Sequence, residues 1–273
     1  MASDDDLAQA LAAEAGRRLL ALRARGGGAE ELRAAGDRLS HEFLVSELAR
    51  VLPGDAVLSE EGRDDPARLA AGRVWIVDPL DGTREFGEPG RSDWAVHVAL
   101  WAGGELTAGA VALPARDRVL STADPVHAVP PVTPPARPRV VVSRTRPPAF
   151  LGRLSEQAGL VPVPLGSAGA KAAAVILGEA DAYLHDGGQY EWDSAAPVAV
   201  ALAAGLHASR LDGSKLEYNQ AAPWQPDILI CPEVLAGRLL AAISAVRPAG
   251  SQPGPRPTAP PVLTDDPEST RWP

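Results

Sequence analysis

WIVDPLDGTREF, residues 75–86, places two carboxylates directly after a run of apolar residues. The run from Val74 to Val77 predicts a strand, and Asp78 and Asp81 stand at its carboxyl end. The proline and glycine that accompany them predict a sharp turn, because proline presets one backbone angle and glycine permits conformations that other residues resist. This stretch therefore predicts a strand that presents two acids on a tight turn.

Such a turn can bind a metal ion and a phosphate together. Asp78, Asp81 and the main-chain carbonyl of Leu80 offer the oxygen ligands that hard divalent cations prefer. The turn also leaves free N–H groups at Gly82 and Thr83, and groups of this kind bind phosphate. The alternative is a structural turn, since most Pro-x-Asp-Gly turns after strands carry no chemistry.

The composition argues against several classes of protein. The chain has 273 residues, of which 45% are hydrophobic, enough for one large domain or two packed halves. Its formal net charge of −9, with no basic block, argues against nucleic-acid polymers and anionic membranes as partners. Cys231 is the one cysteine, and no signal peptide or membrane-spanning run is apparent, so we expect a cytoplasmic protein.

Residues 1–124 predict two helices followed by five strands. The helices fall at residues 7–25 and 39–52, and the strands at 56–58, 74–77, 95–101, 108–113 and 118–122. We expect the last three strands to form an antiparallel meander, because short turns separate them. The first two strands both end in acids, so we expect them to lie parallel.

The second half, residues 139–247, alternates strands with helices. Strands are predicted at 140–143, 161–165, 181–185, 207–210 and 227–231, and helices at 149–158, 168–177, 194–204 and 233–246. This alternation predicts a sheet covered by helices, and hence an α/β fold. A proline-rich connection at 125–138 joins the halves, and residues 248–273 have the composition of a disordered tail.

Four acids stand at the ends of predicted elements: Glu60, Asp78, Asp81 and Asp193. Taken singly, Asp193 would be a helix N-cap, and Glu60 with Glu61 would be a solvated turn. Asp37 would likewise cap the helix that follows it. Taken together, the four acids match a two-metal phosphatase, in which two divalent ions about 4 Å apart clamp a phosphate and activate a water.

Three motifs make the chain resemble the inositol-monophosphatase-like superfamily of Mg²⁺-dependent, lithium-sensitive phosphatases. They are LSEEG at 58–62, DPLDGT at 78–83 and EWDSAAP at 191–197, in the family's order and at its approximate spacing. The resemblance runs from the first helix to about Val246. It implies an α/β fold of α+β type, the α-β-α-β-α layered sandwich that inositol monophosphatases share with fructose-1,6-bisphosphatase.

The resemblance assigns roles to the residues that match these motifs. It implies these metal ligands: Glu60, Asp78, the carbonyl of Leu80, Asp81 and Asp193. Asp78 would bridge two Mg²⁺ ions, Glu61 would act through a water or a third ion, and Mn²⁺ could substitute. Thr83 and Asp37 would orient the attacking water, with Asp37 as proton acceptor. Of the family's Thr-x-x-Asp segment only this aspartate is matched, because Ala34 replaces the threonine.

Within the superfamily the closer resemblance is to the CysQ branch of 3′(2′),5′-bisphosphate nucleotidases, especially its actinobacterial form. The supporting segments are DGTREF at 81–86, VSRTR at 142–146 and GSAGAK at 166–171. A bisphosphate substrate has a second phosphate that the metals do not touch, and Arg144 and Lys171 are candidate cations for it. The alternative for Lys171 is a side chain that extends from its helix towards water. The implied substrate contacts are Asp81, Gly82, Thr83, Arg84, Ser143, Arg144, Lys171 and Asp193.

The implied reaction is attack of water on the 3′-phosphate of adenosine 3′,5′-bisphosphate or its sulfated precursor, which is linked to sulfate assimilation. Inositol phosphates and fructose 1,6-bisphosphate are alternative substrates. The alternative of another class is a noncatalytic metal- or phosphate-binding regulatory module. The partner is a small phosphorylated molecule, and the resemblance also allows a homodimer. We assign these residues to packing: Trp75, Trp94, His97, His207 and Cys231.

Overall fold

The computed structural model describes residues 3–126 and 135–247 of the chain. The first half contains α1 (Asp4–Ala24), α2 (Ala29–Val51), β1 (Ala56–Ser59), η1 (Pro66–Ala70), β2 (Arg73–Asp81), α3 (Thr83–Gly87), β3 (Ala95–Ala102), β4 (Glu105–Leu113), η2 (Pro114–Arg116) and β5 (Arg118–Ser121). The second half contains β6 (Arg139–Ser143), α4 (Leu151–Ala158), β7 (Val161–Leu165), α5 (Ala168–Ile176), β8 (Ala182–Tyr190), α6 (Glu191–Ala203), β9 (His207–Ser209), β10 (Trp224–Cys231) and α7 (Glu233–Val246).

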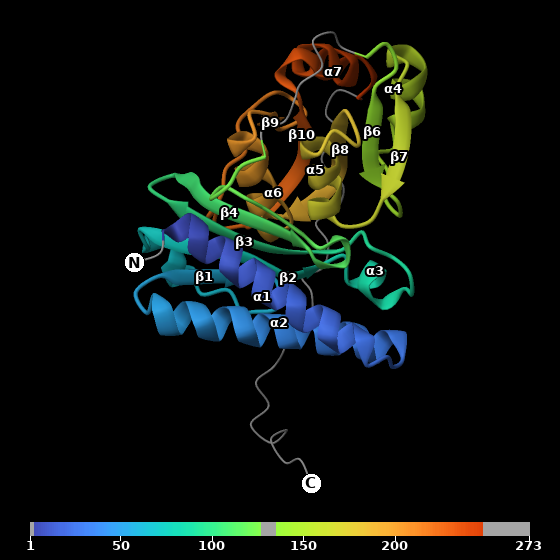
Figure 1. The fold of residues 1–273 in the computed structure, drawn as a ribbon. Coiled ribbons are helices and arrows are strands. Elements are labelled where there is room, and N and C mark those ends of the chain that lie inside the picture. The colour runs from blue at the N-terminus through green and yellow to red at the C-terminus, as the bar shows by residue number, and fades with distance from the viewer. Residues whose placement is uncertain (1–2, 127–134, 248–273) are drawn as a thin grey trace.

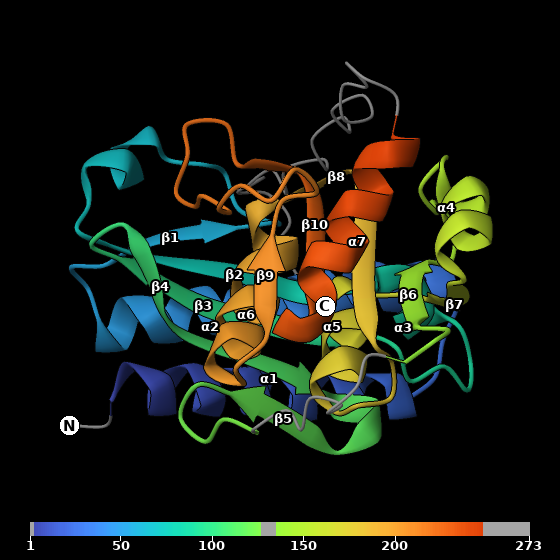
Figure 2. The ribbon, with the colours of Figure 1, turned by 90° about the horizontal axis from the view of Figure 1, so that it is seen from above.

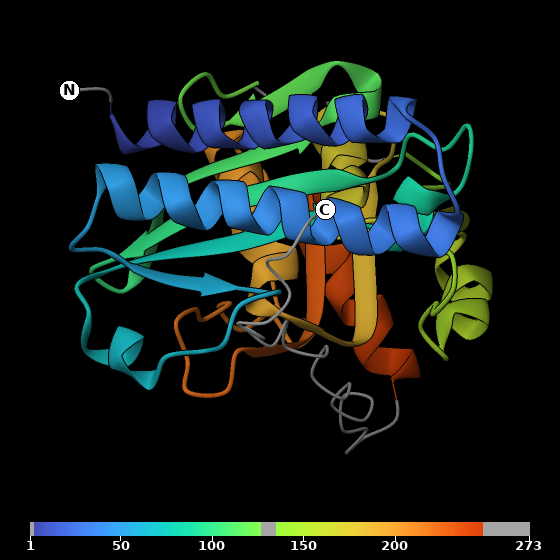
Figure 3. The same cartoon turned by 90° about the horizontal axis from the view of Figure 1, so that it is seen from below.

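These elements stack in five layers (Figure 1). The helices α1 and α2 lie side by side across the outer face of the first sheet (Figure 3). The helices α5 and α6 lie between the two sheets, whereas α4 and α7 pack on the far face of the second sheet, which is seen from above in Figure 2. This arrangement is the predicted α-β-α-β-α sandwich, so the predicted fold class is confirmed.

The first sheet has the strand order β1-β2-β3-β4-β5. Strands β1 and β2 are parallel, with Ser59 opposite Val77, and the remaining pairs are antiparallel. The predictions of a parallel pair and of an antiparallel meander are both confirmed. Because β1 and β2 end at the same edge of the sheet, the residues that follow them come close together there.

The second sheet has the strand order β7-β6-β8-β10-β9. Strand β6 pairs in parallel with β7 and β8, and β10 pairs antiparallel with β8 and β9. Strand β8 continues past the predicted end at residue 185, because Gln189 and Tyr190 pair with β10. This extension brings the chain directly to the start of α6.

Side chains of β2 alternate between two hydrophobic cores. Val74 and Ile76 face the helices between the sheets, whereas Trp75 and Val77 face α1 and α2. All four side chains are fully buried. Burial on both faces explains why this strand appears in the sequence as a continuous apolar run. It also fixes the end of the strand, where Asp78 lies.

Two of the helix boundaries that differ from the prediction concern site residues. Helix α2 begins at Ala29, so Asp37 lies inside it and is not its N-cap. Helix α6 begins at Glu191, so Asp193 is not before the helix but in its first turn. The Asp193 carboxylate accepts a hydrogen bond from the N–H of Tyr190 at 2.6 Å. In both helices, packing against the rest of the protein extends the helix beyond its apolar pattern.

Residues 127–134 of the proline-rich connection and the predicted tail at 248–273 lie outside the described residues. The disorder of the tail and the domain boundaries therefore stay predictions. None of the helices in the described ranges is long and apolar enough to cross a membrane. The packing roles of Trp75, Trp94 and Cys231 are confirmed, since all three side chains are fully buried.

Candidate active site

Three carboxylates converge at the sheet edge where β1 and β2 end. Asp78 and Asp81 belong to the end of β2, and Asp193 belongs to the first turn of α6. One carboxylate oxygen of each residue lies within 4.8 Å of the other two. The structure therefore brings together three of the predicted metal ligands from two segments that are distant in the sequence.

Glu60 comes to the same edge on the turn that follows β1. Its backbone N–H donates to the carbonyl of Val77 at 3.3 Å, which holds the turn against β2. Burial and the charge of Asp193 raise the pKa of Glu60 well above its usual range. Burial and the charge of Glu60 likewise raise the pKa of Asp78. We call Glu60, Asp78, Asp81 and Asp193 the acidic cluster.

Asp81 differs from the other members because it has several partners. Its Oδ2 lies 3.1 Å from Nε2 of His97 and accepts hydrogen bonds from Ser167 Oγ at 2.5 Å and the Gly169 N–H at 2.7 Å. Burial alone would raise the pKa of Asp81, but the opposing effect of His97 and other partners lowers it to about 2. His97 is buried as predicted, yet its contact with Asp81 was missed, because nothing in its apolar strand indicates which carboxylate lies beside it.

The acidic cluster has the chemistry of a site for a hard divalent cation. Its side-chain donors are all carboxylate oxygens, which such cations prefer. Burial and the charge of Asp81 raise the pKa of Asp193 to about 6, so the carboxylates repel one another in a way that bound cations would relieve. The carbonyl of Leu80 lies on the same turn, where it accepts from Thr83 Oγ1 at 3.0 Å. The residues present therefore fit a divalent metal.

Asp37 and Thr83 meet beside the acidic cluster. Thr83 Oγ1 lies 3.3 Å from Oδ1 of Asp37 and 3.0 Å from the carbonyl of Leu80. Burial and the charge of Glu61 raise the pKa of Asp37 to about 7. Burial also raises the pKa of Glu61. The structure thus brings Asp37 and Thr83 together and gives the aspartate a pKa at which it exchanges a proton near neutral pH.

Gly82 allows the turn after β2 to approach the second half closely. Its φ is 85°, in the left-handed region that favours glycine. A Cβ at this position would lie 3.1 Å from Cβ of Ser167 and 3.2 Å from the carbonyl oxygen of Asp93. The turn that carries the N–H groups of Gly82 and Thr83 is therefore packed against the same Ser167 that binds Asp81.

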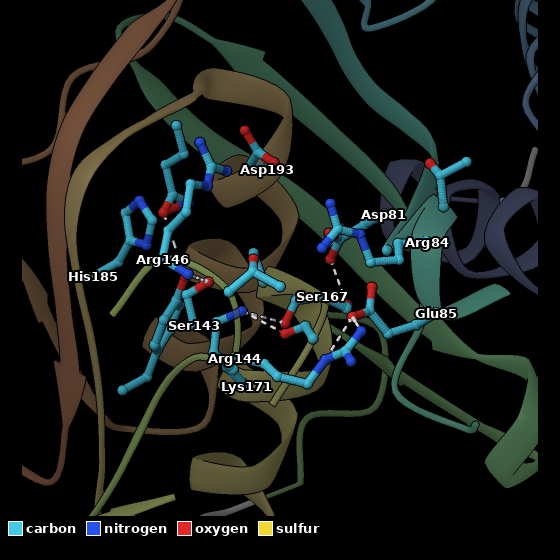
Figure 4. Close-up of a pocket in the computed structure, with 17 residues that line it drawn as sticks. Asp81, Arg84, Glu85, Ser143, Arg144, Arg146, Ser167, Lys171, His185 and Asp193 are labelled. Carbon is cyan, nitrogen blue, oxygen red and sulfur yellow. Dashed lines mark hydrogen bonds and ion pairs between the residues drawn. The ribbon is translucent and has the colours of Figure 1, made fainter. Parts of the chain in front are cut away.

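A cavity of about 550 Å³ opens beside Asp81 and Asp193 (Figure 4). This volume is typical of sites for small molecules. The first half lines it with residues 81–85. The second half lines it with Ser143, Arg144, Thr145, Arg146, Gly166, Ser167, Ala168, Lys171, Tyr183, His185, Gln189 and Asp193. All the predicted substrate contacts are among the lining residues.

Arg144, one of the two predicted cations, is already paired with carboxylates. Its guanidinium lies 2.5 Å from Oε1 of Glu85 and 3.1 Å from Oε1 of Glu88. Both glutamates belong to the first half of the chain, in or just after α3. The structure therefore favours a role for Arg144 as a link between the halves over the predicted contact with a second phosphate.

Lys171, the other predicted cation, is 5% exposed, so the alternative that it extends towards water is wrong. Its ammonium donates to the carbonyl of Gly166 and, at 2.8 Å, to the carbonyl of Ser167. Burial lowers the pKa of Lys171 to about 8, against the opposing effect of Asp81. With two of its three donors engaged, Lys171 supports the segment that holds Asp81 rather than reaching freely into the cavity.

Arg84 and Arg146 are free cations on the cavity wall. Both are exposed, and neither side chain forms a hydrogen bond or ion pair with any residue that the structure describes. Figure 4 shows them on opposite sides of the cavity. Arg146 was missed, although it stands two residues after Arg144, and its N–H donates to Oγ of Ser143 at 3.1 Å. We call Arg144, Arg146 and Lys171 the cationic wall.

Known proteins share both the sequence and the fold. The sequence model of the inositol monophosphatase family matches residues 3–247. A 3′-phosphoadenosine 5′-phosphate phosphatase from Mycobacterium bovis is 55% identical over 239 residues, which cover 85% of this chain and 90% of the relative. The protein of the same name from Mycobacterium leprae is 52% identical over 262 residues, covering 89% and 94%. CysQ from Bacteroides thetaiotaomicron, a solved structure, matches with a TM-score of 0.72 and 25% identity, covering 83% of this chain and 96% of that one.

Proposed function

The chain belongs to the inositol monophosphatase family of phosphomonoesterases, and we propose that it hydrolyses the 3′-phosphate of adenosine 3′,5′-bisphosphate. The names of its mycobacterial relatives support this substrate. The observation that carries the proposal is the presence of two free arginines, Arg84 and Arg146, on a cavity that ends at the acidic cluster. A substrate with two separate phosphates requires a cation beyond the metal site, whereas an inositol monophosphate does not.

The metal in this proposal is Mg²⁺, as two or three ions, because the acidic cluster offers oxygen ligands. When bound, the ions would lower the pKa of a water and stabilise the charge that develops on the phosphate. The first ion would be held by Glu60, Asp78 and the Leu80 carbonyl, and the second by Asp78, Asp81 and Asp193. We further propose a cytoplasmic location, which the single cysteine supports. The homodimer stays a prediction from the family resemblance.

Asp37 and Thr83 would position the attacking water and receive its proton. With Asp37 ionised, the Thr83 hydroxyl donates a hydrogen bond to its carboxylate, which leaves a lone pair of Oγ1 to accept a hydrogen bond from the water. A proton of the water then passes to Thr83, and that of Thr83 passes to Asp37, whose pKa of about 7 suits this task. The N–H groups of Gly82 and Thr83 would bind the phosphate oxygens.

The test is phosphate release by the full chain with Mg²⁺ from adenosine 3′,5′-bisphosphate, inositol 1-phosphate and fructose 1,6-bisphosphate. The first substrate should be preferred. In Arg146→Ala, kcat/KM for the nucleotide should fall about ten- to a hundredfold, because a contact with an ionised group contributes roughly 1.5–3 kcal/mol. Turnover of inositol 1-phosphate should change little, since it has no second phosphate.

Arg118→Ala is the matched control, because Arg118 is an exposed arginine on β5 that does not line the cavity. This variant should behave as wild type on all three substrates. The proposal fails if wild type shows no preference for the nucleotide. It also fails if Arg146→Ala loses the same factor on the nucleotide and on inositol 1-phosphate.

A further inference from the structure

A buried ionic cluster lies outside the cavity, and the reaction described above does not use it. Arg68, in η1 of the first half, is 1% exposed, and Glu191, the first residue of α6, is 0% exposed. Buried charges of this kind are rare unless they are paired and hydrogen-bonded. Their origin in the two different halves of the chain indicates a role in holding those halves together.

Arg68 binds residues on both sides of its guanidinium. Its Nε and Nη2 donate to the two carboxylate oxygens of Asp64 at 2.6 and 3.0 Å. Its Nη1 donates to Oδ1 of Asn219 at 2.7 Å, and Nη2 also donates to the carbonyl of Gln220 at 2.9 Å. The amide of Asn219 returns a hydrogen bond to the carbonyl of Arg68 at 3.3 Å. Arg68 is thereby tied to the loop of the second half that contains Asn219 and Gln220.

Glu191 holds the same loop from the other side. Its carboxylate oxygens accept from the backbone N–H groups of Asn219 at 2.7 Å and Gln220 at 2.8 Å. Asn219 has a φ of 58°, a left-handed conformation that asparagine tolerates better than most residues. We call Asp64, Arg68, Glu191, Asn219 and Gln220 the Arg68 clamp.

The Arg68 clamp connects the two segments that bring the acidic cluster together. Arg68 follows the turn that carries Glu60 and Glu61, and Glu191 stands two residues before Asp193. The negative charges of Glu60 and Asp193 oppose the approach of these two segments when no cation is bound. The clamp holds the two segments without the metal, because Arg68 and Glu191 both bind the loop that contains Asn219 and Gln220.

We propose that the Arg68 clamp holds Glu60 and Asp193 at the separation that the metal ions require, which makes Glu191 a positioning residue for metal binding. The proposal rests on the metal site proposed above. A preorganised site binds its ion more tightly, because binding does not have to overcome the repulsion and the freedom of the ligands. The clamp should therefore set the affinity for Mg²⁺ more than the rate of the reaction once Mg²⁺ is bound.

The test compares Mg²⁺ binding by wild type and Glu191→Gln, using the full chain after removal of metal. The variant replaces one acceptor oxygen with an NH₂ group, which cannot accept from a backbone N–H. By calorimetry its affinity for Mg²⁺ should fall about tenfold, as when residues that support metal ligands are changed. At saturating Mg²⁺, kcat should fall by less than about threefold, a split that a general loss of folded protein would not produce.

Asp55→Asn is the matched control. Asp55 binds Arg73 and Trp75 where β1 and β2 begin, at the end of these strands away from the acidic cluster. It should lower stability and leave Mg²⁺ affinity unchanged. Asn219→Gly keeps the positive φ and the N–H to Glu191 but removes the bond to Arg68, so it tests the clamp even where Glu191→Gln fails to fold. It should also weaken Mg²⁺ binding.

The proposal is overturned if the clamp variants bind Mg²⁺ as wild type does, or lose no more affinity than Asp55→Asn. Either result would mean that the clamp only stabilises the fold. A wild-type protein that binds no Mg²⁺ would instead overturn the metal site on which the proposal rests. The two failures are therefore distinguishable in the same titration.

Discussion

Asp81 and Asp193 of the acidic cluster line the same cavity as the cationic wall, but the acidic cluster and the cationic wall are built differently (Figure 4). The acids stand at or near the ends of strands and a helix, so the ends of those elements set their positions. In the cationic wall, Arg144 is paired with Glu85 and Glu88, and Lys171 with main-chain carbonyls. The comparison teaches that an acid on a short turn has a position set locally, whereas the role of a long cation depends on which acceptors fold within its reach.

The largest expected effect lies on the acidic side of this comparison. Asp81→Asn keeps the size of the side chain and an acceptor for Ser167 but removes a charge. We expect kcat to fall at least about a hundredfold, the scale seen when a main electrostatic stabiliser is removed. Phosphate release with Mg²⁺ measures this effect, and excess chelator should abolish wild-type activity. Full turnover in chelator would show that the cluster does not work through a metal.

The next effect concerns Lys171, for which two carbonyl contacts favour a supporting role over a contact with the substrate. Lys171→Met leaves the carbonyls of Gly166 and Ser167 without their ammonium donor. The free energy of unfolding should fall by about 1.5–3 kcal/mol, as measured in urea. The losses of kcat/KM on the nucleotide and on inositol 1-phosphate should be equal. A loss of kcat/KM on the nucleotide alone would support the predicted contact between Lys171 and the second phosphate.

Burial of Asp193 and its repulsion by Asp81 predict that the stability of the metal-free protein depends on pH. The pKa of Asp193 is about 6 in the folded protein, against about 3.9 in an unfolded chain. The folded state therefore holds this proton more tightly, so ionisation of Asp193 destabilises the metal-free fold as pH rises from about 4 to about 6, and the full cost persists above that range.

Asp193→Asn removes this cost and keeps an acceptor for the N–H of Tyr190. In chelator at pH 7.5 the variant should be more stable than wild type by on the order of 2 kcal/mol, and by about half as much at pH 5. Urea unfolding at the two pH values measures the difference. The same gain at both values would mean that Asp193 does not ionise in this range.

The smallest expected effect is that of Arg144→Ala on substrate choice. If Arg144 links the halves through Glu85 and Glu88, the ratio of kcat/KM for the two substrates should stay within about threefold of wild type. Water screens this exposed ion pair, so the melting temperature should fall only slightly. A tenfold change in the ratio would indicate that Arg144 contacts the substrate, as we propose for Arg146.

The sequence predicts the fold well where burial leaves a clear pattern. Strand β2 is buried on both faces and appears as an apolar run, and β1 ends in acids as β2 does. The start of α2 was missed because its first turns carry no clear apolar stripe. That segment is held instead by close packing, since a Cβ on Gly36 would lie 2.8 Å from the ring of Phe86. The apolar pattern of a helix does not indicate which contacts other parts of the chain will make with it, so the start of α2 could not be predicted.

By itself the sequence determined the acidic turn, because the neighbours in DPLDGT remain neighbours however the rest of the chain folds. Its apolar periodicity also determined most of the helices and strands, whereas the α-β-α-β-α order of the layers was implied by the family resemblance. Only the tertiary structure decided which cation stays free. Arg144 and Arg146 stand two residues apart on one segment, and no local rule separates them. Glu85 and Glu88, which arrive from the other half, neutralise Arg144 and leave Arg146 to the cavity, because a charge pairs with whatever opposite charge folds within about 4 Å of it.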